Sequence, residues 1–470
     1  MNEQERQNRI AALKQALKER ILVLDGATGT FLQELNLNAE DFGGEEYEGC
    51  NEQLVLTRPD VVTAMHERYL EAGADIIETN TFGGTPLVLE EYGLGEKARE
   101  INRAAAQLAR AAADRAMASP ATNTPAKITG GRLRFVAGSI GPTTKAITVT
   151  GGATFFELEE NFHVQALGLI EGGVDYLLVE TSQDTRNVKA ALLGIARACQ
   201  VLGVEIPTAV SVTIEPMGSM LAGQGVEAFY ASIMHADLLY LGLNCATGPA
   251  FMTDHVRSLS LLSRFPLAVV PNAGLPDEDG IYLETPEMMG AVLERFIDQG
   301  WVNLIGGCCG THQAHVRTFE ALVRDKAPRT LPEHRRSLLS GIDFLELTDE
   351  IRPVIVGERT NAVGSRLFKR MIVEERFDEA AEIARRQVNN GAQVIDINMA
   401  NPDRDELADM EQFLSRVIQK IKAPLMIDST DAAVIEAALP YSQGKAIINS
   451  INLEDGEERF ETVVPLARRF

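Results

Sequence analysis

The sequence predicts an α/β protein made of an N-terminal (β/α)8 TIM barrel followed by a second, truncated barrel-like (β/α) domain. Eight short apolar runs alternate with helix-like segments over the first 325 residues, and a second alternating pattern with four runs begins after a polar break. Most of these runs end in Gly, Asn, Asp, Glu or Cys. Parallel strands joined by crossover helices produce this alternation. An open doubly wound sheet is the alternative, but it usually carries Gly-x-Gly-x-x-Gly after its first strand, and residues 25–30 read Asp-Gly-Ala-Thr-Gly-Thr.

The elements of the first domain follow from hydrophobic spacing. Ile10, Leu13 and Leu17 recur at helical intervals and predict an amphipathic helix over residues 3–19. The eight predicted strands each combine an apolar run with a polar end, and they cover residues 21–24, 76–80, 135–139, 176–181, 209–212, 239–244, 267–272 and 302–307. The clearest helices between them cover residues 61–72, 98–117, 155–171, 185–202 and 286–299. An acidic, glycine-rich insertion over residues 37–51 predicts a surface loop on the side of the strand ends, with a lid as the alternative.

The second pattern is shorter. Residues 1–325 form the predicted first domain, residues 326–350 a linker with one short helix, and residues 351–470 the second domain. Its predicted strands cover residues 354–361, 394–398, 425–429 and 446–452, and its helices residues 375–390, 407–421, 431–438 and 458–470. Four strands do not close a barrel, so we expect the first half of a second (β/α)8 domain in a shortened or incomplete chain.

Composition narrows the class of protein. The chain has 44 Lys and Arg against 67 Asp and Glu, a formal charge of -23, which disfavours binding to nucleic acid or anionic membranes. Five cysteines, an odd number, do not make a disulfide framework. The polar N-terminus lacks a signal peptide, and no apolar run approaches the roughly 20 residues that span a bilayer. We therefore expect a soluble, cytoplasmic protein.

Three cysteines stand at predicted strand ends. Cys245 follows one apolar run, and the adjacent Cys308 and Cys309 follow another between glycines. Vicinal cysteines also occur in tight turns or redox disulfides, and the usual Cys-x-x-Cys zinc spacing is absent. A third thiol has no role in a vicinal disulfide, however, and a catalytic zinc keeps about three protein ligands with one position open. Such a site is suited to activating a substrate thiol, since a metal-bound thiol is deprotonated.

Other strand ends carry polar residues with a separate role. Asp25 and Glu180 are placed to hold the ammonium group of an amino-acid substrate, although Asp25 also fits an ordinary Asp-Gly turn. His312 and His315 follow the paired cysteines at helical spacing, and we interpret them as residues on the surface or directly behind the metal ligands, and not as ligands. A hydrolytic zinc site would more often use His and Glu ligands, and the chain has no His-Glu-x-x-His.

The strand ends of the second domain carry carboxylates and amides without thiols or a basic cluster. This set suits a flat heterocycle with many donors, such as a pterin or a purine, and its alternative is a set of ordinary strand-end caps. The residues are Glu358, Asn361, Asp396, Asn398, Asp428 and Asn449.

Taken together, these motifs resemble known families. The runs at 25–30, 180–184, 244–246 and 306–310 resemble the homocysteine S-methyltransferase family over nearly all of residues 10–325. The runs at 357–361, 396–398, 428–429 and 449–452 resemble the pterin-binding domain. The two in this order resemble the N-terminal half of cobalamin-dependent homocysteine methyltransferases.

The resemblance implies an activity. Cys245, Cys308 and Cys309 would bind Zn2+ with the sulfur of L-homocysteine as a further ligand, and Asp25, Glu180 and Asn244 would bind the rest of the substrate. Methylcobalamin, bound by a cobalamin-binding domain of the same full-length chain, would donate the methyl group that makes L-methionine. 5-Methyltetrahydrofolate on the second domain would re-methylate the cobalamin, with the six strand-end residues from Glu358 to Asn449 contacting the pterin.

The sequence also departs from that pattern. The last four strands of a pterin barrel, an Asp-x-His-x-x-Gly loop for cobalamin and an S-adenosylmethionine reactivation domain are not found, so we expect homocysteine binding, poor folate binding if any, and turnover only with added cobalamin. A betaine- or sulfonium-dependent homocysteine methyltransferase is an alternative, but such a donor needs no second domain. A fusion to methylenetetrahydrofolate reductase would need a flavin motif, and a non-catalytic zinc or redox scaffold would use zinc saturated by protein ligands.

Overall fold

The computed structural model describes residues 3–119, 122–124, 127–129, 131–333, 336–453 and 456–470. The chain divides into two compact units. The first contains most residues up to 333, and the second contains the residues beyond 333 together with segments 184–189 and 222–236. Within the described part of the chain, no helix is both long and apolar enough to cross a membrane.

The first unit is built on one parallel sheet of eight strands, in the order β1-β10-β9-β8-β7-β6-β5-β2. Leu22 pairs with Leu304 at one seam, and a parallel bridge between Leu24 and Ile76 joins the two outer strands at the other. The sheet is therefore a nearly closed barrel, as the alternating pattern predicted. Its strands are β1 Leu22–Val23, β2 Ile76–Glu78, β5 Phe135–Ile140, β6 Tyr176–Ser182, β7 Thr208–Val212, β8 Leu238–Asn244, β9 Leu267–Val270 and β10 Leu304–Ile305.

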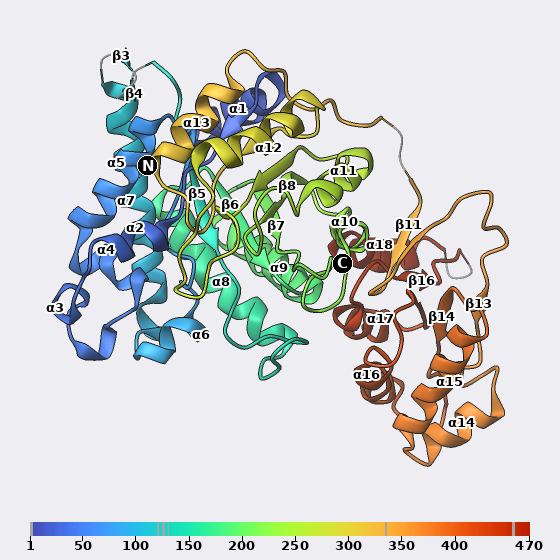
Figure 1. Cartoon of the computed structure of the whole chain (residues 1–470). Coiled ribbons are helices and arrows are strands. Elements are labelled where there is room, and N and C mark those ends of the chain that lie inside the picture. The colour runs from blue at the N-terminus through green and yellow to red at the C-terminus, as the bar shows by residue number, and fades with distance from the viewer. Residues whose placement is uncertain (1–2, 120–121, 125–126, 130, 334–335, 454–455) are drawn as a thin grey trace. The chain divides into compact units, whose positions relative to one another are not determined.

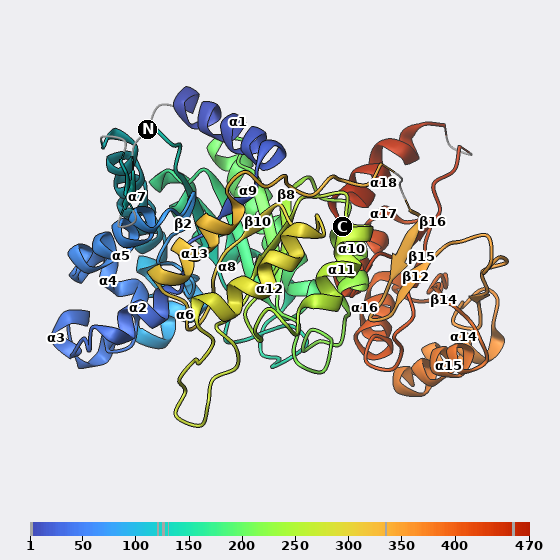
Figure 2. The same ribbon diagram turned by 45° about the horizontal axis from the view of Figure 1, so that its top comes forward.

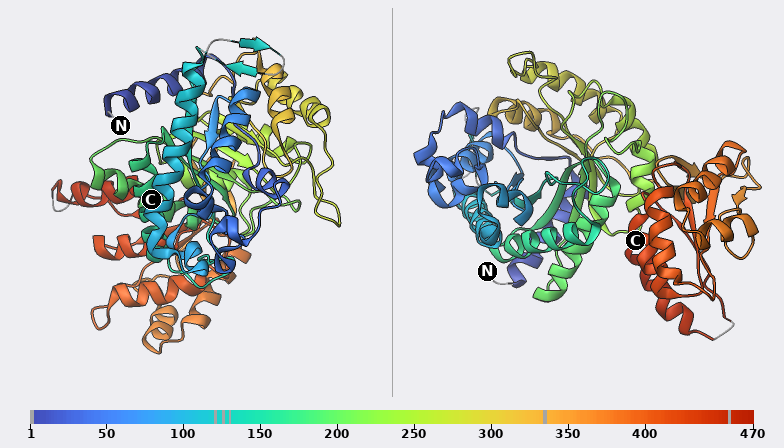
Figure 3. Two further views of the ribbon diagram at one scale, coloured as in Figure 1. Left: turned by 90° about the vertical axis from the view of Figure 1, so that its left-hand side faces the viewer. Right: turned by 90° about the horizontal axis from the view of Figure 1, so that it is seen from below.

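Helices surround these strands, as the right-hand view of Figure 3 shows. The long helices of the chain up to residue 333 are α1 Glu3–Glu19, α5 Pro59–Ala72, α7 Ala98–Ala118, α8 Phe155–Gly172, α9 Thr185–Leu202, α11 Thr253–Leu262, α12 Pro286–Asp298 and α13 Gln313–Val323 (Figure 1). Local sequence sets their ends. Thr154 and Glu157 form a capping box at the start of α8, and Gly73 ends α5 in a left-handed conformation at φ 113°.

Shorter elements fill the connections. Residues 37–51, predicted as a loop, contain the short helix α3 Ala39–Phe42 and a single 3-10 turn at Glu45–Tyr47. The remaining short helices are α2 Thr28–Glu34, α4 Leu54–Thr57, α6 Pro86–Leu89 and α10 Val226–Ile233, and a small antiparallel pair is formed by β3 Thr122–Thr124 and β4 Lys127–Thr129. Figure 2 shows α12 and α13 lying along the outside of the strands.

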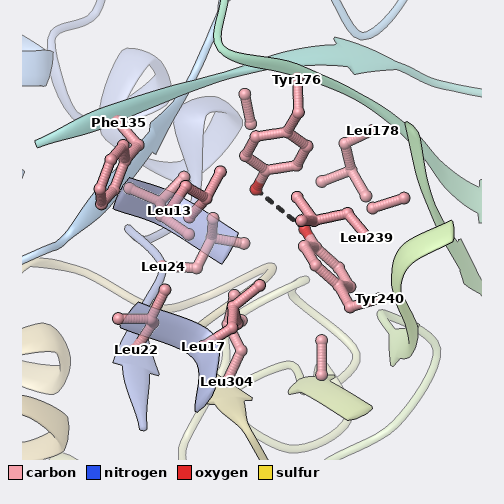
Figure 4. Packing of buried hydrophobic residues seen from close by; sticks show 14 of the residues in the cluster. Leu13, Leu17, Leu22, Leu24, Phe135, Tyr176, Leu178, Leu239, Tyr240 and Leu304 are labelled. Atoms are coloured by element: carbon pink, nitrogen blue, oxygen red, sulfur yellow. Dashed lines mark hydrogen bonds between the residues drawn. The ribbon is translucent and has the colours of Figure 1, made fainter. Parts of the chain in front are cut away.

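The barrel interior is apolar on the side away from the carboxyl ends of the strands. Leu13 and Leu17 of α1 pack against inward-facing strand residues, and the hydroxyl groups of Tyr176 and Tyr240 lie 2.9 Å apart across the interior (Figure 4). Side chains on a strand alternate between its faces, so the next inward positions along β2 and β6 are Glu78 and Glu180. The interior therefore changes from apolar to acidic toward the carboxyl ends of the strands.

Buried ion pairs brace the opposite end of the barrel. Asp75, immediately before β2, accepts two hydrogen bonds of 2.8 Å from Arg20, two of 2.7 and 2.8 Å from Arg132, and one of 3.0 Å from the Val23 backbone. The Asp75 side chain is fully buried, and these partners hold its pKa below the usual range against the opposing effect of burial. A buried carboxylate such as that of Asp75 stays ionised only while its hydrogen-bonding and charged partners remain in place.

The second unit contains four parallel strands in the order β13-β14-β15-β16, which confirms the predicted pattern. These are β13 Val356–Gly357, β14 Val394–Ile397, β15 Leu425–Asp428 and β16 Ile447–Asn449. The helices are α14 Arg366–Val373, α15 Phe377–Asn389, α16 Glu406–Val417, α17 Ala432–Ala438 and α18 Glu458–Arg469. Phe368 and Phe413 pack edge to face, 5.1 Å apart, and anchor α14 to α16.

The predicted linker differs from what the structure shows. Strands β11 Leu338–Ser340 and β12 Phe344–Glu346 pair antiparallel where one short helix was predicted. The pairing turns at Gly341, where an added Cβ would lie 2.4 Å from the carbonyl oxygen of Lys422, so only glycine fits. Residues 334 and 335 of the predicted linker lie outside the described residues, and the predicted boundaries at 325 and 350 remain predictions.

Candidate active site

Three thiols meet at the carboxyl ends of the barrel strands. Cys245 follows β8, and Cys308 and Cys309 lie a few residues after β10. Their sulfur atoms all lie within 4.8 Å of one another, and those of Cys245 and Cys309 are 3.8 Å apart. In the described ranges, this is the one group of three or more His, Cys, Asp or Glu side chains with metal-ligand spacing.

Neighbouring loops fix the positions of these thiols. Cys245 adopts φ 61°, a left-handed conformation that is uncommon for a residue with a side chain, and its N–H donates to the carbonyl of Val270. The N–H of Cys308 donates to the carbonyl of Pro271, and that of Cys309 to Oδ1 of Asn272. The last residue of β9 and the segment that follows it therefore position all three cysteines, although they contribute no thiol.

A tyrosine covers one side of the cluster. The Tyr282 hydroxyl is hydrogen-bonded to Cys309, and the Tyr282 ring lies directly over Gly310. A Cβ on Gly310 would lie 2.3 Å from the Cβ of Tyr282, and Gly310 has φ 78°. The glycine that follows the paired cysteines is thus required both for the turn and for the approach of Tyr282.

The geometry of the donor set fits a tetrahedral thiolate-bound metal. With zinc–sulfur bonds of about 2.3 Å and tetrahedral angles, two sulfur ligands lie roughly 3.8 Å apart. The separation between Cys245 and Cys309 matches this value. All three thiols also line a cavity, so a fourth coordination position would face a ligand bound there.

The thiols share negative charge unequally. Hydrogen bonds from Cys245 and Cys308 lower the pKa of Cys309 to about 3, while its own hydrogen bonds with Cys245 and Cys309 raise the pKa of Cys308. The cluster therefore holds one thiolate easily and resists a second. A bound cation would remove that resistance, because metal-bound thiols are deprotonated.

The cavity beside the thiols has a volume of about 260 Å³. It is enclosed by the ends of the barrel strands, with Tyr240 and Leu178 toward the apolar interior and Phe82 among the residues that line it. No Lys, Arg or His belongs to its lining among the residues that the structure describes. Three acidic side chains, Glu52, Glu78 and Glu180, do.

Asp25, Glu78 and Glu180 form an acidic group in which Glu78 and Glu180 line the cavity and Asp25 is buried beside Glu78. The N–H of Glu78 donates to Oδ2 of Asp25 at 2.9 Å, and Ser139 Oγ donates to Oε1 of Glu180 at 2.5 Å. Burial raises the pKa of all three, and mutual repulsion adds to the effect for Asp25 and Glu78. For Glu180 burial is the largest cause, and its pKa rises to about 7. No basic side chain of the described cavity lining pairs with these three acids.

Asn244, predicted to contact the substrate, is largely engaged with the protein. Its Oδ1 accepts hydrogen bonds from the Thr181 N–H at 3.0 Å and from Ser211 Oγ at 2.7 Å. Its Nδ2 donates to Thr181 Oγ1 at 2.7 Å. Because Thr181 follows Glu180 directly, these contacts make Asn244 a support for the acidic group, and a direct contact with substrate stays a prediction.

The polar strand ends of the second unit also come together. Asn361 Nδ2 donates to Oδ2 of Asp396 at 3.0 Å and to Oδ2 of Asp428 at 3.2 Å, and Asn398 is hydrogen-bonded to Asp428. Burial raises the pKa of Asp396 to about 6. Among the described residues, Oδ1 of Asp396 is buried without a hydrogen-bond partner, which leaves an acceptor for a ligand donor.

The other predicted residues of that unit lie less deeply. Glu358 is exposed just after β13, and Asn449 ends β16, where it pairs in register with Asp428. All six predicted residues therefore lie at the same ends of neighbouring parallel strands. Their role in binding remains a prediction.

Several residues of the first site were not predicted from the sequence. Glu78 ends a predicted strand as Glu180 does, so the same signal was present, whereas Tyr282 lies in a loop with no periodic pattern. His315, predicted to lie on the surface or directly behind the metal ligands, is only 2% exposed, which excludes the surface, and its Nε2 lies 3.1 Å from the carbonyl oxygen of Glu284. His312 is the N-cap of α13.

Fold and site together define a parallel α/β barrel with a thiol cluster and an acid-lined cavity at the carboxyl ends of its strands. Residues 22–323, more than half of the chain, match the family model for homocysteine S-methyltransferase, and the chain belongs to this family. Residues 357–470 match the model for pterin binding enzymes, so a pterin-binding domain follows the methyltransferase domain.

Solved structures show a similar fold. The oxidised form of the homocysteine methyltransferase MmuM from Escherichia coli is 22% identical with a TM-score of 0.51, over 64% of this chain and 95% of that one. The metallated form of the same enzyme is 22% identical with a TM-score of 0.51, over 65% of this chain and 96% of that one. At this level of identity the likeness concerns the fold.

Proposed function

We propose that this chain methylates L-homocysteine to L-methionine as the homocysteine- and folate-binding part of a cobalamin-dependent methionine synthase. The observation that carries the proposal is the meeting of three thiols, whose sulfur atoms lie within 4.8 Å of one another, with an acid-lined cavity of about 260 Å³. The thiol side of the cavity suits a sulfur atom, and the acidic side suits an ammonium group. Homocysteine carries both.

The protein's own residues orient this substrate. Asp25 and Glu180 receive the ammonium group, because the described cavity lining holds no basic side chain that could pair with these buried acids. Asn244 and Ser139 hold Glu180 and Thr181 in place for this contact. Cys245, Cys308 and Cys309 are the residues that would hold zinc, which when bound lowers the pKa of a coordinated thiol so that it is a nucleophile at neutral pH.

The second unit supports a folate donor over betaine or a sulfonium compound. A donor that reacts directly at the thiol site needs no pterin-binding domain, and residues 357–470 match one. Asp396 offers a buried unpaired acceptor, and Asn361 and Asp428 lie beside it, as a pterin ring with several donors requires. In this proposal 5-methyltetrahydrofolate supplies the methyl group, and methylcobalamin, held by a cobalamin-binding domain of the full-length chain, carries it to homocysteine.

The decisive experiment measures zinc content and zinc-edge X-ray absorption, with and without L-homocysteine. We expect about one zinc per chain and a further sulfur ligand at roughly 2.3 Å after homocysteine is added. Absence of zinc, or a sulfur shell that ignores homocysteine, would remove the basis of the proposal and favour a non-catalytic zinc or redox scaffold.

The methyl donor is tested separately. The zinc-loaded protein is incubated with homocysteine and one of three donors, namely methylcobalamin, betaine or S-methylmethionine, and methionine is quantified. We expect methionine with methylcobalamin alone. Methionine formed with betaine or S-methylmethionine would contradict the cobalamin part of the proposal and leave homocysteine methylation intact.

A further inference from the structure

We propose that Glu78 is a third substrate-recognition residue, which makes the cavity selective for thiols that carry an ammonium group. The inference rests on the proposed function and goes beyond it, since sequence analysis assigned the ammonium group to Asp25 and Glu180 only. It concerns specificity, that is, which thiols the site admits.

Glu78 is placed to reach a ligand in the cavity. Ile76, two residues earlier on β2, belongs to the packed barrel interior, so strand alternation turns Glu78 inward as well, and its side chain lines the cavity. Its backbone N–H donates to Oδ2 of Asp25. The two acidic residues are therefore held next to each other by the barrel backbone and not by flexible loops.

The carboxylates differ in how many protein hydrogen bonds they accept. Glu180 accepts hydrogen bonds from Ser139 and Thr181, and Glu52 at the same cavity accepts one of 2.6 Å from the N–H of Gly83. Throughout the described part of the chain, no hydrogen bond to the carboxylate of Glu78 is found, and no cation pairs with it. Glu78 is thus the acidic residue of the cavity whose oxygen atoms are both available to a ligand.

The charge balance defines the ligand that fits. The described lining contains no basic side chain, so a positive charge to pair with Glu78 and Glu180 has to come from the ligand. A primary ammonium group has three N–H donors, which is enough for both carboxylates. With a thiol that lacks an ammonium group, burial favours the protonated forms of these acids, and no ion pair forms.

Three thiol ligands distinguish recognition of the ammonium group by Glu78 from binding of thiols in general. L-Homocysteine has both an ammonium and a carboxylate group, 3-mercaptopropylamine lacks the carboxylate, and 4-mercaptobutanoate lacks the ammonium. Dissociation constants are measured by calorimetry on the zinc-loaded full chain, for the parent protein and for Glu78→Gln, Glu78→Asp and Glu34→Gln. Zinc content and melting temperature check that each variant is folded.

We expect Glu78→Gln to weaken binding of the two ammonium-bearing thiols by about 10- to 100-fold, as for the loss of a charged hydrogen bond. Binding of 4-mercaptobutanoate should be unchanged or tighter, so the preference for ammonium collapses. Glu78→Asp should keep the preference with weaker binding. Glu34→Gln, which removes the same charge from an exposed carboxylate outside the cavity lining, should change the preference less than about threefold.

The outcomes distinguish the two proposals. If the parent protein binds homocysteine and Glu78→Gln keeps its preference for ammonium, or weakens all three thiols equally, the role of Glu78 is wrong and the proposed function stands. If the parent protein binds none of the thiols, the proposed function fails and the inference fails with it.

Discussion

The side-chain amide of Asn244 forms two hydrogen bonds with Thr181. The Thr181 N–H donates to Oδ1 of Asn244 at 3.0 Å, and Nδ2 of Asn244 donates to Thr181 Oγ1 at 2.7 Å. Thr181 has φ 55°, a conformation that costs free energy for a β-branched residue. The pair links β8 to the end of β6, so the residue next to the first thiol also sets the position of Glu180.

Replacement of Asn244 by Ala should therefore weaken substrate binding without removing the metal ligands. We expect the dissociation constant for L-homocysteine to rise about tenfold, a loss of about 1.4 kcal/mol. Zinc content should remain near that of the parent protein. Calorimetric titration and metal analysis measure both quantities, and an unchanged dissociation constant would show that the Thr181 contact does not support the site.

Loss of one thiol should abolish metal binding. The variant Cys308→Ser replaces one of three ligands that converge within 4.8 Å, so we expect the zinc content to fall well below the roughly one ion per chain of a catalytic site. Homocysteine binding should fall with it. Cys199→Ser, at a cysteine in α9 outside this cluster, is the control and should keep both. Full zinc occupancy in Cys308→Ser would mean that the metal binds elsewhere.

The buried ion pairs at the other end of the barrel should matter for stability and not for binding. Asp75→Asn leaves Arg20 and Arg132 without their shared carboxylate, and removing one partner of a buried pair costs about 3–5 kcal/mol. Asp298→Asn, which breaks an exposed pair with Lys326, should cost at most about 1 kcal/mol. Urea unfolding measures the difference.

The contribution of Asp75 to the free energy of unfolding depends on pH. Because the partners of Asp75 lower its pKa in the folded protein, its ionised form stabilises the fold above the unfolded-state pKa of about 3.9. That stabilisation is lost as the pH falls further. The difference in unfolding free energy between parent and Asp75→Asn should therefore be largest near neutral pH and shrink in acid, and a difference that grows in acid would contradict the assignment.

The ionised form of Asp396 should destabilise the fold, in contrast to that of Asp75. Burial raises its pKa to about 6, so the folded second unit is penalised as the pH rises from about 4 to 6 and the carboxylate ionises. Asp396→Asn removes this penalty and can still accept the hydrogen bond from Asn361. Calorimetric unfolding should show a higher transition temperature for the variant at pH 7.5, with a gain that shrinks below pH 6. A variant that is less stable at every pH would refute this account.

Much of this architecture could be predicted from local patterns. Every predicted strand overlaps a strand of the structure, because apolar runs with polar ends are what buried parallel strands require. The thiols and Asp25 and Glu180 were found because each directly follows such a run. Their convergence on one cavity follows from the barrel, which brings the carboxyl ends of all its strands to one face.

What the sequence could not supply were contacts between distant segments. The role of Asn244 depends on Thr181, and that of Tyr282 depends on a glycine that leaves room for its ring. The pairing of β11 with β12 was missed because two three-residue strands are too short for a periodic signal. Burial of His315 was missed for a related reason, since a helix of 11 residues shows its inner face only when its neighbours are known.

The seam between β1 and β10 has a consequence for synthesis of the protein. Residue 22 pairs with residue 304, so the first strand emerges from the ribosome long before its partner exists. At typical translation speeds of about 5–20 residues per second, the wait lasts roughly 15 to 60 seconds. During this time an apolar strand edge is open to wrong partners, and the last two cysteines of the cluster have yet to be made. The complete set of three thiols, and with it the proposed metal site, can therefore form only after residue 309 has been made.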